Sequence, residues 1–372
     1  MLLIDFTQIA IGALMSQLHH KSETVDEKLV RHVVLNTLRS YYSKFNEKDV
    51  IKITDIGENK ILELYHGPTF SFKDRPAGVA ISKAKEFGLT AVGCASTGNL
   101  ASATAAHAAR AGIPCYIFIP HDIEQAKILQ VQAYGANIIL INGTYDDANR
   151  LASYAGDKYN IGIVNINLRT YYVEGSKTLA FEVCEQLGWN APDHVIVPTG
   201  SGAMLCAIDR GLKEFEKIDL ITNNNTKITS AQPEGCSPIV DAIKNKTNVI
   251  QPVKKPNTLA KSLAIGEPGD GIFAVETVNN SGGYGENAND EEIRESIRLL
   301  ASTEGIFAEP GGAISIAILL KLVRDGKIDA NEKVVCYVTG NGLKAPEAAF
   351  IQQPELKVVE PKREVLEDII GR

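Results

Sequence analysis

Hydrophobic and polar positions follow two different periods along most of the chain. From about Leu89, short apolar runs such as AVGCAS, CYIFIP and NIILING are each followed by a segment in which apolar residues recur at helical spacing. Continuous apolar strands that alternate with helices are typical of a parallel sheet covered on both faces. The pattern therefore predicts an α/β protein.

The same alternation resumes after Glu174 and ends with the apolar run KVVCYV. With 372 residues, the chain is longer than one ordinary hydrophobic core requires. We expect two lobes with parallel or mostly parallel sheets and helices on both faces. The predicted divisions are an atypical N-terminal segment (1–50), a large lobe (51–88 and 174–350), a small lobe (89–173) and a C-terminal tail (351–372).

Charge and composition narrow the classes of partner. The net charge is −7, and Lys and Arg form no long run, so we expect no nucleic-acid partner. No apolar stretch approaches the roughly 18 to 20 residues that cross a bilayer, and no signal peptide is recognised. The six cysteines are scattered without a Cys-x-x-Cys pair, which favours buried thiols, a reducing cytoplasm and no metal site.

Two segments at the ends of predicted strands carry candidate chemistry. Lys73 lies in HGPTFSFKDR, after an apolar strand and beside two aromatic residues. A partly desolvated lysine amine is a useful nucleophile, although a Lys-Asp-Arg triplet is also common at a solvated helix start. The glycine-rich turn, residues 198–203, joins a buried strand to a helix. Its backbone N–H groups are suited to an anion such as phosphate, but a plain strand-to-helix turn has the same pattern.

Two further polar turns have the same position relative to a strand. Ser96-Thr97-Gly98-Asn99 begins a predicted helix, where its hydroxyls and amide either bind a ligand or cap the helix. The segment 338–342 (VTGNG) follows the last strand, and its glycines also suit a tight turn. Taken singly, neither turn identifies a function.

The order of these four segments resembles the tryptophan-synthase-β-like family, the second fold type of pyridoxal 5′-phosphate (PLP) enzymes. Within residues 52–350, the segments GPTFSFKDR, CASTGNLASA, EGSKTLAFEVCEQLGW, KSLAIGEPGD, EPGGA and TGNGLK resemble the threonine synthases. This resemblance implies a PLP-dependent lyase of threonine biosynthesis. Its substrate would be O-phosphohomoserine, which water converts to L-threonine and phosphate by γ-elimination and β-addition.

The resemblance also implies a role for each matching residue. Lys73 would bind the cofactor covalently and move protons at the substrate Cα and Cβ, and Asn99 would donate to the phenolic oxygen of PLP. Thr339 would face the pyridine nitrogen. The backbone donors to the PLP phosphate would be Gly200, Ser201, Gly202, Ala203 and Met204. The substrate would contact Ser96 and Thr97 through its carboxylate, and its phosphate would be near Asn167, Arg169, Lys261 and Ser262.

The chain departs from the family pattern at two of these places. Tyr172 stands where the family usually has an arginine before the Glu-Gly pair, so Arg169 is the nearest substitute for binding the substrate phosphate. Ser201 replaces the usual asparagine of the glycine-rich turn. Glu309, in EPGGA, is interpreted as a charge at a helix N-terminus rather than as an acid catalyst.

Other interpretations of the chain remain open at this point. It has the features of another lyase of this fold type, such as a threonine dehydratase or a cysteine synthase. A chimeric, inactive chain that only binds PLP is a further alternative. A homodimer is one open assembly state. Residues 1–47 resemble the start of a phage ribonuclease H of the flap-endonuclease family, in which Asp5 would be a metal ligand. No further nuclease segment follows, so we expect the first fifty residues to be dispensable for the chemistry.

Overall fold

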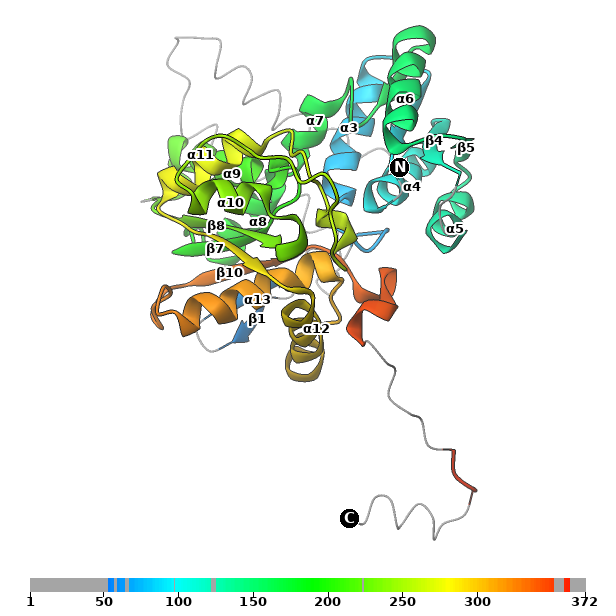
Figure 1. Cartoon of the computed structure of the whole chain (residues 1–372). Coiled ribbons are helices and arrows are strands. Elements are labelled where there is room, and N and C mark those ends of the chain that lie inside the picture. Colours follow the sequence, from blue (N-terminus) through cyan, green and yellow to red (C-terminus); the bar gives the residue numbers. More distant parts are fainter. Residues whose placement is uncertain are drawn as a thin grey trace, which may run out of the picture.

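The computed structural model describes residues 53–56, 59–63, 67–96, 98–121, 125–222, 224–350 and 358–361. The atypical N-terminal segment, including Asp5, lies outside the described residues, as does most of the C-terminal tail. The described part of the chain contains two sheets and the helices around them (Figure 1).

The larger sheet has the strand order β1-β2-β10-β7-β8-β9. Its strands are β1 (Ile53–Ile56), β2 (Asn59–Glu63), β7 (His194–Pro198), β8 (Lys227–Pro233), β9 (Gly285–Ala288) and β10 (Val334–Val338). β1 pairs with β2 in the antiparallel sense, and all other neighbours are parallel. The mostly parallel sheet predicted from the continuous apolar runs is therefore confirmed.

Helices cover both faces of this sheet. One face packs against α8 (Thr178–Gln186), α9 (Ala203–Lys217), α10 (Pro238–Lys244) and α11 (Gly271–Ser281), and the other against α12 (Asp290–Glu304) and α13 (Pro310–Arg324). Successive strand residues point to opposite faces. Val195 and Val197 accordingly belong to the first hydrophobic cluster, whereas Ile196 between them belongs to the second.

The smaller sheet is parallel throughout and has the strand order β5-β4-β3-β6. Its strands are β3 (Ala91–Ala95), β4 (Cys115–Pro120), β5 (Asn137–Ile141) and β6 (Ile161–Ile163). On one face lie α3 (Asp74–Glu86), α4 (Asn99–Ala111), α5 (Gln125–Ala133) and α7 (Arg169–Gly175), and on the other lies α6 (Tyr145–Tyr159). Short 3₁₀ helices complete the described elements: η1 (Glu234–Cys236), η2 (Lys261–Leu263), η3 (Gly342–Lys344) and η4 (Pro346–Ala349).

Helix α3 connects the two halves of the molecule. The sequence pattern assigned residues 51–88 to the large lobe, but Ala80, Ile81 and Ala84 of α3 pack into a cluster with the smaller sheet and α4. α3 and α7 lie between the helices of the two sheets (Figure 1). The lysine at the start of α3 therefore stands where the two halves meet.

Local sequence signals account for several helix ends. α6 and α12 each begin with a capping box, formed by Thr144 with Asp147 and by Asn289 with Glu292. Such a cap stabilises a helix by about 1 kcal/mol. α4 ends at Gly112, whose φ of +66° lies in the left-handed region that glycine adopts without a Cβ penalty.

The cysteines agree with a further expectation. All six cysteines are unpaired and buried, as predicted. Burial raises the pKa of the Cys94 thiol to about 12, so this group stays protonated and unreactive at neutral pH. Among the described helices, none is both long enough and apolar enough to cross a membrane.

Candidate active site

The strand ends of the larger sheet bring the predicted turns together. β2, β10 and β7 are parallel neighbours, so their carboxyl ends lie at one edge of the sheet. The loop that leads to Lys73 pairs with the turn after β10 through the bridge between Ser71 and Gly340. The Phe72 N–H donates to the carbonyl of Thr339 at 3.0 Å. Lys73 and the buried Thr339 are thus held in neighbouring segments.

A buried carboxylate fixes the loop before Lys73. Asp74, the first residue of α3, accepts from the backbone N–H of Thr69 at 3.0 Å and from its hydroxyl at 2.9 Å. A Cβ on Gly67 would collide with the Asp74 carboxylate, so this position requires glycine. These contacts determine the position of Lys73, the N-cap residue of α3.

The Lys73 amine lies among aromatic rings. Its Nζ donates to the phenolic oxygen of Tyr172 on α7. Nζ is 4.6 Å from the centroid of the Phe72 ring and 5.1 Å from that of Tyr172. Aromatic faces and a phenol hold a lysine amine in place while shielding it from water. A half-buried lysine of this kind is the expected environment for covalent attachment of a carbonyl cofactor.

The glycine-rich turn fits a phosphate group. Gly202 has a φ of +96°, and a Cβ there would lie 2.8 Å from the backbone oxygen of Asp270 and 3.0 Å from Ala274 Cβ. The turn opens directly into α9, a helix of 15 residues. The first N–H groups of a helix lack helical acceptors, and the helix dipole favours an anion there. Close backbone packing and backbone donors at a helix start are the features that a cofactor phosphate needs, and the Ala203 N–H donates to the Ser201 hydroxyl at 3.4 Å.

A cation stands beside this turn. Arg169, at the start of α7, forms an ion pair with Asp270, and the Asp270 N–H donates to the carbonyl of Ser201 at 2.9 Å. Arg169 and Tyr172 are three residues apart and therefore project from the same side of α7. One short helix thus contacts both the lysine and the border of the glycine-rich turn.

Asn99 meets a residue that sequence reasoning did not place in the site. It is the first residue of α4, and its Nδ2 donates to both carboxylate oxygens of Glu309, at 2.9 and 3.2 Å. Burial raises the pKa of Glu309, and the Asn99 hydrogen bond and the charges of Lys344 and Lys73 oppose this rise. The Glu309 carboxylate therefore lies within electrostatic reach of the Lys73 amine.

The remaining predicted residues have varied surroundings. The amide of Asn167 accepts from the Ile163 N–H at 2.7 Å and donates to the Ile161 carbonyl at 3.0 Å, so it is engaged at the end of β6. The Ser96 hydroxyl accepts from the Gly98 N–H at 3.3 Å. Thr97 lies outside the described residues.

Lys261 and Ser262 belong to the short helix η2, and both are exposed. The carbonyl of Ser262 would be 3.6 Å from a Cβ on Gly200. A Cβ on Gly311, near the start of α13, would collide with the Ser262 hydroxyl. Ser262 therefore lies between the glycine-rich turn and the segment of Glu309, and Lys261 is its exposed neighbour.

Sequence reasoning missed the roles of three polar residues. Tyr172 was noted only as a departure from the family pattern, although its position three residues after Arg169 is a helical signal that could have been used. Lys344, in the TGNGLK segment, donates to the carbonyl of Thr69 at 2.8 Å and to the amide oxygen of Gln130 at 3.2 Å. Nothing local in the sequence indicates that Lys344 and Glu309 converge, because they approach from different elements.

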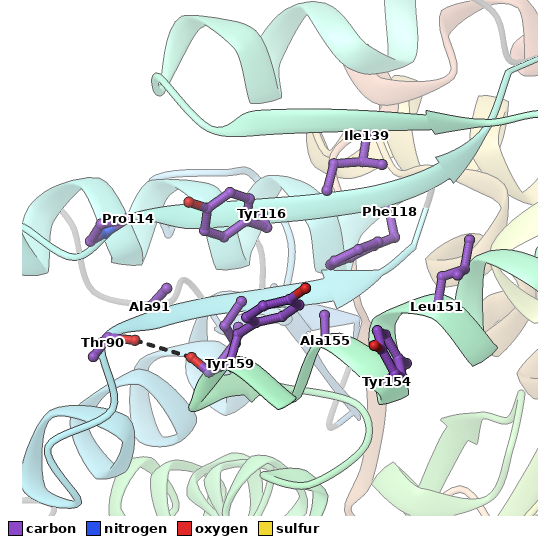
Figure 2. A pocket seen from close by; sticks show the side chains of 11 residues that line it. Thr90, Ala91, Pro114, Tyr116, Phe118, Ile139, Leu151, Tyr154, Ala155 and Tyr159 are labelled. Atoms are coloured by element: carbon purple, nitrogen blue, oxygen red, sulfur yellow. Dashed lines mark hydrogen bonds between the residues drawn. The ribbon is translucent and has the colours of Figure 1, made fainter. Parts of the chain in front are cut away.

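A hollow of about 610 Å³ lies away from these residues (Figure 2). It lies between the smaller sheet and α6, and side chains such as Tyr116, Phe118, Tyr154 and Tyr159 line it. None of the predicted site residues lines it, and it has no charged side chain. We therefore place the candidate site at the strand ends rather than in this hollow.

The fold, Lys73 and the polar turns at the strand ends together point to a class of enzyme. The family model described as "Pyridoxal-phosphate dependent enzyme" matches residues 62–340. Solved structures share the fold: threonine deaminase isoform 2 of Solanum lycopersicum (processed form) has a TM-score of 0.66 at 22% identity, covering 77% of this chain and 76% of that chain. Maize serine racemase has a TM-score of 0.66 at 21% identity, and the match covers 82% of this chain and 91% of that chain.

Sequence relatives narrow the class further. The threonine synthase of Methanocaldococcus jannaschii is 42% identical over 304 residues, which are 82% of this chain and 75% of the relative. The threonine synthase of Methanosarcina acetivorans is 38% identical over 318 residues, 85% of this chain and 78% of the relative. The chain belongs to the PLP-dependent enzymes of the second fold type and, among them, to the threonine synthase family.

Proposed function

We propose that the enzyme converts O-phosphohomoserine and water to L-threonine and phosphate, with Lys73 as the cofactor lysine. Bound PLP supplies an electron sink for negative charge at the substrate Cα. The Lys73 amine takes and returns protons at the substrate Cα and Cβ. Its half-buried position against Phe72 and Tyr172 supports this role, because a shielded amine exchanges protons with the substrate rather than with bulk water.

The proposed remaining cofactor contacts come from the turns at the strand ends. The backbone N–H groups of residues 200–204 hold the PLP phosphate, and Asn99 donates to the phenolic oxygen. Thr339 faces the pyridine nitrogen, where its hydroxyl, unlike a carboxylate, leaves the nitrogen largely unprotonated and so restrains the electron sink. Ser96, with Thr97, binds the substrate carboxylate at the start of α4.

The observation that carries the choice of substrate is the position of Arg169. A phosphorylated substrate needs a second anion site close to the one that holds the cofactor phosphate. Arg169 supplies a cation at the border of the glycine-rich turn, through its pairing with Asp270. A guanidinium binds phosphate in a bidentate way. Lyases that act on unphosphorylated amino acids have no need of this second cation.

A product assay tests the proposal. The purified protein with PLP and O-phosphohomoserine should release threonine and phosphate in equal amounts. Arg169→Ala should raise KM for O-phosphohomoserine about thirtyfold, because a charge-assisted contact is lost, while PLP binding stays unchanged. Arg210→Ala is the matched control, since Arg169 and Arg210 both pair with an acidic residue and are 40% and 42% exposed. Release of a keto acid from threonine, with no threonine formed from O-phosphohomoserine, would instead indicate a dehydratase.

We also propose that the enzyme acts in the cytoplasm as a homodimer. Six unpaired buried cysteines support a reducing compartment. The exposed side chains of Ile272 and Phe273 on α11 supply apolar surface of the kind that subunit contacts cover. Sedimentation velocity measures the assembly directly.

A further inference from the structure

Glu309 is a buried carboxylate whose position is not explained by the helix that it begins. It is the N-cap residue of α13, yet its side chain accepts no hydrogen bond from the helix N–H groups. A capping carboxylate would turn toward those donors. The Glu309 side chain instead reaches the amide of Asn99, at the start of a helix on the other sheet.

The surroundings of Glu309 make room for this orientation. Its backbone N–H donates to the carbonyl of Gly340 at 2.9 Å. A Cβ on Gly340 would collide with the Glu309 carboxylate, so a larger residue there would displace it. Burial raises the pKa of Glu309, and the hydrogen bond from Asn99 and the positive charges of Lys344 and Lys73 oppose that rise. These contacts hold the Glu309 carboxylate at a defined position beside Asn99.

A carboxylate opposite an amide determines which way the amide faces. An ionised carboxylate only accepts hydrogen bonds, so only the Nδ2 edge of Asn99 can contact it. Nδ2 carries two hydrogens, and the two carboxylate oxygens of Glu309 can share one of them in a three-centre hydrogen bond, which leaves the second available. Without the carboxylate, the amide can rotate by half a turn and present Oδ1, which repels the phenolic oxygen of PLP.

We propose that Glu309 is a positioning residue that fixes the orientation of the Asn99 amide, so that its second N–H donates to the phenolic oxygen of the cofactor. This inference rests on the role proposed above for Asn99. Glu309 acts through Asn99 and takes no part in proton transfer. If Glu309 only linked α4 to α13, substitutions at Glu309 and Asn99 would change stability without a specific effect on the cofactor.

Cofactor affinity in the full chain is the first test. Glu309→Gln should weaken PLP binding about tenfold and shift the visible absorption band of the bound cofactor, because a glutamine allows either amide orientation. In an Asn99→Ala background, the same substitution should change affinity by less than about twofold. Additive effects of the two substitutions would overturn the proposal.

The matched control is Glu286→Gln on β9. Glu286 is also buried and forms ion pairs with Lys244 and Lys327, away from the cofactor segments. This substitution should lower the melting temperature but leave PLP affinity and the absorption band unchanged. A band shift of the same size in Glu286→Gln would count against a specific role of Glu309.

An exchange of the two side chains separates positioning from a structural link. In Asn99→Asp two carboxylates face each other, and the melting temperature should fall. Adding Glu309→Gln restores an amide–carboxylate pair and should restore the melting temperature. It should not restore PLP affinity, because the carboxylate that replaces the Asn99 amide has no N–H for the phenolic oxygen. Recovery of both quantities would show that the pair is only structural.

These measurements do not depend on the substrate. If the enzyme bound PLP but formed no threonine from O-phosphohomoserine, the proposed function would fail while the affinity and spectra still tested Glu309. If threonine were formed and the two substitutions were additive, only the inference about Glu309 would fail.

Discussion

At the scale of single residues, the surroundings of Lys73 explain how an ordinary side chain becomes useful for chemistry. An exposed lysine amine is strongly hydrated and moves freely. Here Phe72 and Tyr172 shield the amine, and the Tyr172 hydroxyl accepts its hydrogen bond. These contacts therefore hold the free amine in one orientation.

Tyr172→Phe should lower kcat about tenfold while the protein still binds PLP, because the ring remains and only the hydrogen-bond acceptor is removed. The measurement is steady-state turnover together with thermal melting. Tyr171→Phe is the control, because the Tyr171 ring packs edge-on against Phe87, with a centroid distance of 5.3 Å, and does not face the lysine. Equal turnover in Tyr172→Phe and the parent enzyme would remove Tyr172 from the proton-transfer machinery.

At the scale of elements, local patterns predict much of the fold. The apolar runs that became β3, β4, β7 and β10 were recognisable because both faces of each strand are buried. The glycine-rich turn was recognisable because it separates such a strand from a helix. Four candidate segments could therefore be placed at strand ends from the sequence alone.

What the sequence could not show is which side chains from different elements meet. The contact between Asn99 and Glu309 joins residues 210 positions apart, and that between Lys73 and Tyr172 joins residues 99 apart. No local spacing encodes such contacts, because they depend on how α4, α7 and α13 pack. For the same reason Asn167 looked available for a phosphate, although its amide is engaged by the backbone of β6.

The geometry of the turn between β7 and α9 leads to a prediction for Gly202→Ala. The left-handed φ costs alanine about 1 kcal/mol, and the added Cβ would also press against the Asp270 carbonyl. We expect PLP affinity to fall about tenfold or more because the turn must shift. Fluorescence titration with PLP measures this affinity.

Gly188→Ala supplies the control for backbone strain. Gly188 has a φ of +68°, and the nearest atom to an added Cβ would be 3.9 Å away. This variant should lose a similar amount of stability from the left-handed φ but bind PLP normally. If both variants bound PLP equally well, close packing at Gly202 would not matter for the phosphate.

At the scale of the whole molecule, the site exists only where the two sheets and their helices meet. Lys73 is the N-cap residue of α3, which packs with the smaller sheet, while its loop is hydrogen-bonded to the turn after β10 of the larger sheet. Lys344 reaches from that larger sheet to Gln130 on α5. The cofactor would therefore contact both halves, and its binding should stabilise the whole fold by linkage.

The covalent attachment of PLP to Lys73 is the central claim, and borohydride reduction of the holoenzyme tests it most directly. Reduction followed by proteolysis and mass spectrometry should place the reduced pyridoxyl group on the peptide that contains Lys73. Lys73→Ala should carry no label and have no measurable turnover. Lys344 is the informative alternative, because burial lowers its pKa and it lies near Glu309. Label on Lys344, or full turnover in Lys73→Ala, would contradict the account.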